Sequence, residues 1–158
     1  MIKNQNRARD TKRVSDAQAI IKALELYKLD NKGQYPDAVF SESGSLDGWE
    51  ASSKEAAGEF LAQLKPYGFN AGVPLDPVND AQDGTFAVAK TNNRYTYAYY
   101  RYPAGNAGCD SARGQYYVFG ILRTSSYIYA TYLGSPGFSC TSRDWQADFS
   151  WVTGKFEK

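Results

Sequence analysis

Histidine is absent from this chain of 158 residues, and its absence excludes several kinds of active site. Such a chain has no Ser-His-Asp or Cys-His nucleophile pair, no histidine-based zinc site and no imidazole general base. The carboxylates Asp144 and Asp148 are spaced closely enough for acid–base work, but a solvated surface beside Arg143 is the simpler interpretation. An enzyme is therefore the class of protein that the composition favours least.

Cysteine is scarce, with only Cys109 and Cys140 in the chain. Two cysteines cannot form a four-thiolate zinc site, and these two lie too far apart for a C-x-x-C redox pair. A single structural disulfide between them is the simplest use, and two buried free thiols are the alternative. In the chain-entropy model, a disulfide that closes a loop of this size stabilises by roughly 3 to 4 kcal/mol, which suits a protein outside the cytoplasm.

The chain also lacks a long hydrophobic run and an excess of either charge. Its longest apolar stretch, Tyr116 to Leu122, is far shorter than the about 20 residues that span a bilayer. With 18 basic and 17 acidic residues the net charge is only +1, so no sequence-specific binding of nucleic acid is expected. The charge is unevenly spread, because residues 1 to 13 carry +4 and the remainder −3.

Apolar residues recur at spacings of three and four between Arg7 and Asp30, and this pattern predicts one amphipathic helix. The stripe consists of Val14, Ala17, Ile20, Ile21, Leu24 and Tyr27. Gly33 and Pro36 end the helix. Its start has almost no apolar side chains, so we expect it to protrude from the domain and to meet solvent, lipid headgroups or neighbouring subunits. The basic residues of this protruding start are Lys3, Arg7, Arg9, Lys12 and Arg13.

The rest of the chain is expected to contain one short helix and a sheet. Ser52 and Glu55 form a capping-box pattern that predicts a helix ending at Pro66. Strands are predicted at Thr85–Ala89, Arg94–Tyr102, Gln115–Arg123 and Tyr127–Leu133, the last two joined as a hairpin. A change in side-chain alternation between Tyr99 and Tyr100 predicts a bulge.

These elements predict a single α+β domain with an antiparallel sheet of three to four strands. Its parts are an N-terminal helix over residues 1–33, an αβ-loop over 34–84, the sheet over 85–133 and an irregular aromatic tail over 134–158. Met1 is the only methionine and stands before a polar segment, so it is either the native start or an added one.

Two features resemble ligand sites without requiring a ligand. Ten of the 13 tyrosines fall between Tyr95 and Tyr132, which indicates a sheet and also suggests a stacking platform for sugars or bases, near Arg94, Arg101 and Arg113. A loop with Asp76, Asn79, Asp80 and Asp83 gathers possible calcium ligands but lacks the EF-hand spacing, and Asx turns explain it equally well. No metal, cofactor or catalytic residue is assigned.

Trp49 is the one aromatic residue that neither the predicted helices nor the predicted sheet requires. It lies in a glycine-containing loop, so we expect it at the surface, in a subunit contact or in adhesion.

The first 36 residues carry the most specific motifs of the chain. These are Ala8-Arg9-Asp10-Thr11-Lys12-Arg13, Ala23-Leu24-Glu25-Leu26-Tyr27, Asp30-Asn31 and Gly33-Gln34-Tyr35-Pro36. They resemble the stretch that directly follows the hydrophobic N-terminal segment in type IV pilins and type II secretion pseudopilins. The turn Pro74-Leu75-Asp76-Pro77 is similar to the loop that leads into the sheet of that family, whereas the sheet itself matches only in outline.

The resemblance implies a pilin-like fold and a structural role. It implies a precursor anchored in the inner membrane by an upstream hydrophobic helix, a methylated N-terminus, and assembly by pilus or secretion machinery into an extracellular filament for adhesion, motility or DNA uptake. Self-association would then run through the N-terminal helix and its basic start. Two alternatives stay open: a pseudopilin of a type II secretion system, and a soluble binding module that uses the tyrosine-rich sheet. Because major pseudopilins typically hold calcium in the C-terminal region and lack a disulfide there, Cys109 and Cys140 favour the pilin side.

Overall fold

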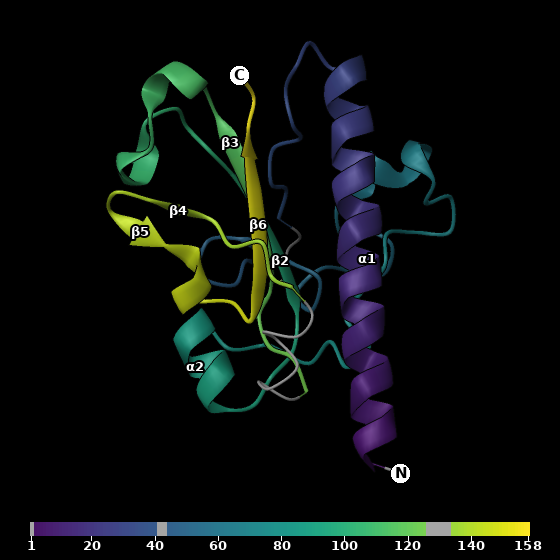
Figure 1. Ribbon diagram of the computed structural model, residues 1–158. Helices are drawn as coiled ribbons and strands as arrows, with labels where there is room; N and C mark the ends of the chain where they lie inside the picture. The colour runs from purple at the N-terminus through teal and green to yellow at the C-terminus, as the bar shows by residue number, and fades with distance from the viewer. Residues whose placement is uncertain (1, 41–43, 126–133) are drawn as a thin grey trace.

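One long helix, α1 (Ile2–Asp30), lies along one face of a four-stranded antiparallel sheet (Figure 1). The computed structural model describes residues 2–40, 44–125 and 134–158, with side chains from Asn4 onward. The architecture is therefore α+β, as the sequence predicts. Among the described residues no helix is both long and apolar enough to span a membrane.

The sheet has the strand order β1-β2-β3-β6. Its strands are β1 (Glu50–Ala51), β2 (Tyr97–Tyr102), β3 (Tyr116–Ile121) and β6 (Trp151–Phe156). The central strand β3 pairs with β2 and with β6 over its whole length, and all its residues are buried.

Both faces of the sheet are covered, which explains why β3 is apolar on both sides. One face, with Tyr99, Tyr117 and Phe119, packs against the predicted apolar stripe of α1. The opposite face, with Tyr116 and Val118, lies under segments that precede β1 or connect the strands. Alternating side chains point to opposite faces of a sheet, so these two cores follow directly from the register.

Short elements cover the face opposite α1 (Figure 1). They include α2 (Phe86–Thr91), the hairpin of β4 (Ser139–Cys140) and β5 (Arg143–Asp144), and the 3₁₀ helix η4 (Trp145–Ala147). The 3₁₀ helix η1 (Ala62–Tyr67) packs against α1 instead, and η2 (Asn106–Gly108) and η3 (Ser111–Arg113) lie between β2 and β3.

The predicted helix between Ser52 and Pro66 is wrong. Ser52 extends the pairing of β1 with β2, because its N–H donates to the Tyr97 carbonyl and its Oγ accepts from the Tyr97 N–H. A residue held in this way cannot cap a helix, and only Ala62–Tyr67 form a short 3₁₀ helix.

The predicted strand Thr85–Ala89 is also wrong, because this segment forms α2. The Thr85 side chain caps the helix by accepting a hydrogen bond from the Val88 N–H at 3.2 Å. Local capping therefore overrides the β propensity of a short apolar run.

The tail contains β6, which pairs with β3, so the prediction of an irregular tail is wrong. The predicted bulge is wrong as well, since β2 and β3 pair without interruption from Tyr97 with Ile121 to Tyr102 with Tyr116. Aromatic residues on both faces of β2 produce the apparent change of alternation. The predicted strand Tyr127–Leu133 lies outside the described residues.

A substitution at Gly120 on β3 tests how tightly the second core, on the sheet face opposite α1, is packed. A Cβ atom added there would overlap the ring of Phe149. Overpacking a core typically costs about 1–3 kcal/mol, so we expect Gly120→Ala to lower the free energy of unfolding by that amount in urea titrations. Gly84→Ala is the matched control, because a Cβ on Gly84 meets no atom within 4 Å. Equal midpoints for the two variants would show that this core is not close-packed.

Candidate functional site

The basic start of α1 is the site that the sequence singles out. Its first turns extend past the strands of the sheet (Figure 1). Arg7, Arg9 and Lys12 are exposed, and Lys12 forms an ion pair with Asp16 at 2.6 Å. The side chain of Lys3 lies outside the described side chains.

Arg13 does not belong to this exposed set, and the prediction that it protrudes is wrong. Its side chain is fully buried, and so is that of Asp10 one turn earlier. Arg13 lies four residues before Ala17 and seven before Ile20, so it continues the apolar stripe of α1 toward the N-terminus. Its charge is compensated inside the protein and is not available to a partner.

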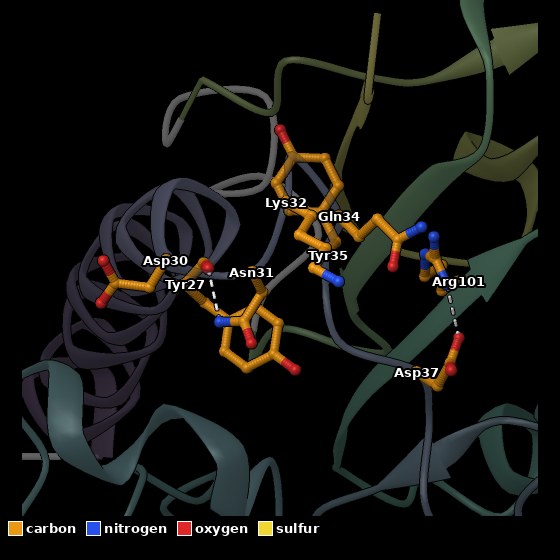
Figure 2. A pocket seen from close by; sticks show the side chains of 8 residues that line it. All are labelled: Tyr27, Asp30, Asn31, Lys32, Gln34, Tyr35, Asp37 and Arg101. Carbon is orange, nitrogen blue, oxygen red and sulfur yellow. Dashed lines mark hydrogen bonds and ion pairs between the residues drawn. The ribbon is translucent and has the colours of Figure 1, made fainter.

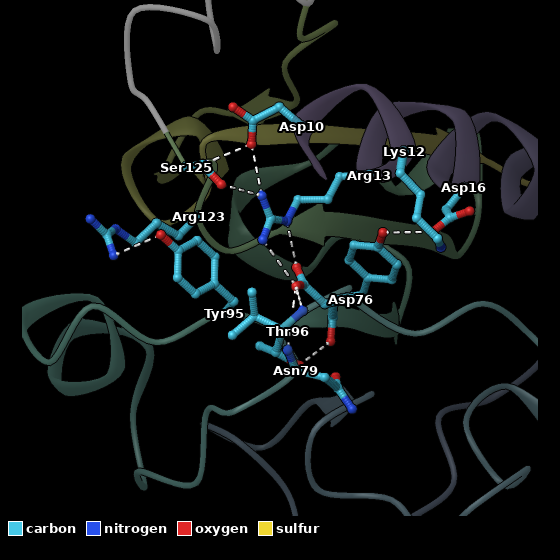
Figure 3. Close-up of polar contacts among 12 residues, drawn as sticks. Asp10, Lys12, Arg13, Asp16, Asp76, Asn79, Tyr95, Thr96, Arg123 and Ser125 are labelled. Carbon is cyan, nitrogen blue, oxygen red and sulfur yellow. Dashed lines mark hydrogen bonds and ion pairs between the residues drawn. The ribbon is translucent and has the colours of Figure 1, made fainter. Parts of the chain in front are cut away.

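The guanidinium of Arg13 joins α1 to two distant loops (Figure 3). Its Nε and Nη2 donate to the two carboxylate oxygens of Asp76, at 2.9 and 3.2 Å. Its Nη1 donates to Asp10 Oδ1 at 2.7 Å and to Ser125 Oγ at 2.9 Å. Asp10 Oδ1 in turn accepts from the Ser125 N–H at 2.7 Å. The loop before α2 and the segment after β3 are thus both fastened to the helix.

The electrostatics of this cluster favour the charged form of Arg13. Burial by itself lowers the pKa of the guanidinium, but hydrogen bonds and charges from Asp76 and Asp10 raise it above its ordinary value. The ring of Tyr95 lies 4.6 Å from the Arg13 guanidinium and adds a cation–π contact. Asp10 Oδ2 is buried with no hydrogen-bond partner among the described residues, so one carboxylate oxygen of the cluster is left without a donor there.

The loop that suggested calcium ligands uses its carboxylates within the protein. Asp76 holds Arg13 and also accepts from the Val78 N–H, while Asp80 accepts from the Tyr95 N–H and pairs with Arg94. Residues 2–40, 44–125 and 134–158 contain no group of three or more acidic or cysteine side chains placed to hold a metal ion.

Trp49 is buried, with 3% of its surface exposed, so its predicted place at the surface is wrong. Its Nε1–H donates to the Tyr102 hydroxyl at 3.1 Å, and its ring packs against Phe86 and Phe149. The turn through Gly48, which has a positive φ of 81°, folds the segment back onto the sheet just before β1 begins. The tryptophan is therefore an anchor of the second core.

The disulfide between Cys109 and Cys140 is confirmed, with the two Cα atoms 5.0 Å apart. It joins the end of η2 to β4 and so ties the loop between β2 and β3 to the C-terminal segment. The covalent link stabilises the side of the sheet that faces away from α1.

The tyrosine-rich strands are core elements. On β2 and β3, Tyr97, Tyr99, Tyr102, Tyr116 and Tyr117 are all buried, and Tyr100 is half-buried. The described strands therefore offer no open face on which sugars or bases could stack. Three further tyrosines, Tyr127, Tyr129 and Tyr132, lie outside the described residues.

A pocket of about 260 Å³ lies at the C-terminal end of α1 (Figure 2). Arg101 on its wall is already bound by Glu157, at 2.8 and 2.9 Å, and by Asp37 at 2.8 Å. Glu157 also accepts from the Tyr35 N–H, so this network joins β2, the C-terminal end and the residues after α1. The lining combines two acidic and two basic side chains, and this balance selects no particular ligand.

Comparisons of the chain with protein-family models, with curated proteins and with solved structures find no match.

The Arg13 cluster is the feature that sequence reasoning missed. Two signals point to it: the position of Arg13 in phase with the apolar stripe, and Asp76 in a proline-flanked turn. Neither signal by itself shows that the two residues meet, because 63 positions separate them.

Arg13→Met tests how much this cluster contributes to the free energy of unfolding. The substitution leaves Asp10 and Asp76 buried without a cation, and breaking a buried ion pair in this way typically costs about 3–5 kcal/mol. We expect urea unfolding to show a loss of that size. The matched control is Lys12→Met, which alters a neighbouring but exposed ion pair and should change stability by less than about 1 kcal/mol. Similar losses in the two variants would show that the buried Arg13 cluster contributes no more to stability than an exposed ion pair does.

Proposed function

We propose that this chain is the part of a type IV pilin that follows the hydrophobic N-terminal segment, and thus a structural subunit of a bacterial filament. In this proposal α1 continues an upstream apolar helix, and the sheet is displayed at the filament surface. The filament would serve adhesion, motility or DNA uptake.

The observation that carries the proposal is the form of α1. The helix packs on the sheet through residues from Val14 to Leu24 and is fastened to two loops by Asp10 and Arg13, yet it begins at Ile2 and its first turns extend past the strands (Figure 1). The side chains of these turns are mostly exposed and polar, so the domain's own core does not explain why the helix is so long. A stem, by which we mean the exposed face of residues 4–12, that contacts neighbouring subunits explains it.

Two further features support the proposal. The Cys109–Cys140 disulfide fastens the C-terminal region, as the resemblance to pilins implies, and favours a pilin over a calcium-stabilised pseudopilin. The exposed cations Arg7, Arg9 and Lys12 lie on the stem, whereas the remainder of the chain is net acidic. A basic start of α1 and a net acidic remainder suit contacts between copies that repeat along a filament.

The direct test is to sequence the native gene upstream and to examine the surface of the cells that express it. We expect codons for an apolar run of about 20 residues, and filaments that antibodies against this chain label in electron micrographs. A native reading frame that starts at Met1, or labelling confined to the cell interior, would contradict the proposal.

Charge reversal on the stem tests the assembly surface in the full-length protein. We expect Arg9→Glu combined with Lys12→Glu to reduce the yield of sheared filaments several-fold and to leave the domain folded, because exposed ion pairs contribute only about 0–1 kcal/mol each. Wild-type filaments should also loosen at high salt, where such contacts are screened.

Lys32→Glu is the matched control, because Lys32 is an exposed cation beyond the opposite end of the helix. Equal filament yields for the stem variant, the control and the wild type would show that the stem cations take no part in assembly.

A further inference from the structure

Glu50 on β1 has a fully buried carboxylate that holds two separate segments of the chain. Its Oε1 accepts from the Val39 N–H at 2.9 Å, and its Oε2 accepts from the Leu61 N–H at 2.6 Å. Val39 belongs to the connection of residues 34–40 that follows α1, and Leu61 immediately precedes η1. One side chain thus fastens both segments to the sheet.

No cation among the described residues pairs with Glu50. The ionisable side chains that act on it or respond to it are Glu55, in the turn after β1, and Tyr99, its cross-strand neighbour on β2. Burial raises the pKa of Glu50 to about 7, the two backbone N–H groups oppose this shift, and the charge of Glu55 adds to it. The carboxyl group therefore changes its protonation state near neutral pH.

A proton on this carboxyl group conflicts with its hydrogen bonds. The ionised group accepts at both oxygens, whereas the protonated oxygen becomes an O–H donor and then faces another donor. The bond from one of the two backbone N–H groups is then weakened, because a protonated oxygen is a poorer acceptor than a carboxylate oxygen.

The two N–H groups differ in how easily they reach water. Leu61 is 0% exposed and has a left-handed backbone with φ 47°, so its N–H cannot turn outward without dislodging a core side chain. Val39 is 56% exposed, and its neighbour Phe40 is 45% exposed. The hydrogen bond from the Val39 N–H is itself only partly buried, whereas that from the Leu61 N–H is buried, so the Val39 N–H is the one that water reaches more easily.

We propose that Glu50 is a pH-sensitive latch on the connection between α1 and the sheet. Above neutral pH the carboxylate holds Val39 and Leu61 together. Below it the protonated side chain keeps Leu61 and releases Val39, which frees the exposed apolar pair Val39 and Phe40 to move or to dock elsewhere. This latch is built into the domain and does not depend on the filament proposal.

A rise in pH has opposite effects on local order and on global stability. It fastens Val39 to Glu50, but it lowers the stability of the whole domain. Native Glu50 binds its proton more tightly than the unfolded chain does, since its pKa is raised from 4.5 to about 7. Its contribution to stability is therefore largest below pH 4.5 and is lost as the pH rises to 7. Relative to a variant without the carboxyl group, the unfolding equilibrium constant should rise about tenfold per pH unit in that window.

The test is an NMR titration of the isotope-labelled chain between about pH 5 and about pH 8.5, a range that contains the shifted pKa and excludes ordinary carboxyl groups. We expect the Glu50 carboxyl carbon to titrate with a midpoint of about 7. The Val39 amide should lose roughly tenfold or more in hydrogen-exchange protection factor toward acid pH, while the Leu61 amide stays protected. A Glu50 midpoint below about pH 5, or a Val39 protection factor that does not change with pH, would overturn the proposal.

Glu50→Gln fixes the neutral state, because the amide has only one acceptor oxygen. We expect its Val39 amide to be unprotected at every pH and to show no transition. Glu59→Gln removes an exposed carboxyl group nearby and should keep the wild-type transition. If Glu50→Gln does not fold, the titration of the wild type and of Glu59→Gln decides the question.

Discussion

The packing of α1 against the aromatic face of β2, β3 and β6 is the contact on which the other elements depend. β3 is apolar on both sides, and α1 covers only one face of the sheet. The second apolar face must therefore be shielded from water by other elements. The hairpin β4–β5, α2 and Trp49 supply that second cover, and the Cys109–Cys140 disulfide keeps the C-terminal part of it in place. The domain is thus a sheet enclosed between a helix and a set of short, irregular elements.

Two buried charged groups locate the loops relative to this framework. Arg13 binds Asp76 and Ser125 from the middle of α1, and Glu50 binds the N–H groups of Val39 and Leu61 from the edge of the sheet. They work by different electrostatics, because Arg13 has anionic partners whereas Glu50 has only backbone dipoles. The first is a fixed anchor, and the second is the group that we propose responds to pH. Neither belongs to the exposed stem, so the proposed assembly surface and these internal contacts are separate.

Local patterns predicted some elements well and others poorly. The stripe from Val14 to Leu24 is long and regular enough to define α1 and its buried face. Short segments were harder, because Ser52 pairs with β2 instead of capping a helix and Thr85 caps a helix instead of starting a strand. Trp151 to Phe156 is rich in strand-forming side chains, but local pattern alone does not show it to be a strand, because its partner β3 lies about 30 residues earlier in the chain.

The sequence by itself determined the α+β class, the apolar side of the long helix and the exposed cations Arg7, Arg9 and Lys12, and it left Cys109 and Cys140 no partner within the chain except each other. These properties depend on local spacing or on a count, and both can be read along the chain. The tertiary structure decided that Arg13 and Trp49 are buried and that Glu50 holds two loops. Burial of a polar or aromatic side chain depends on partners far away in the sequence, and only the folded chain brings Arg13 to Asp76 or Trp49 to Tyr102.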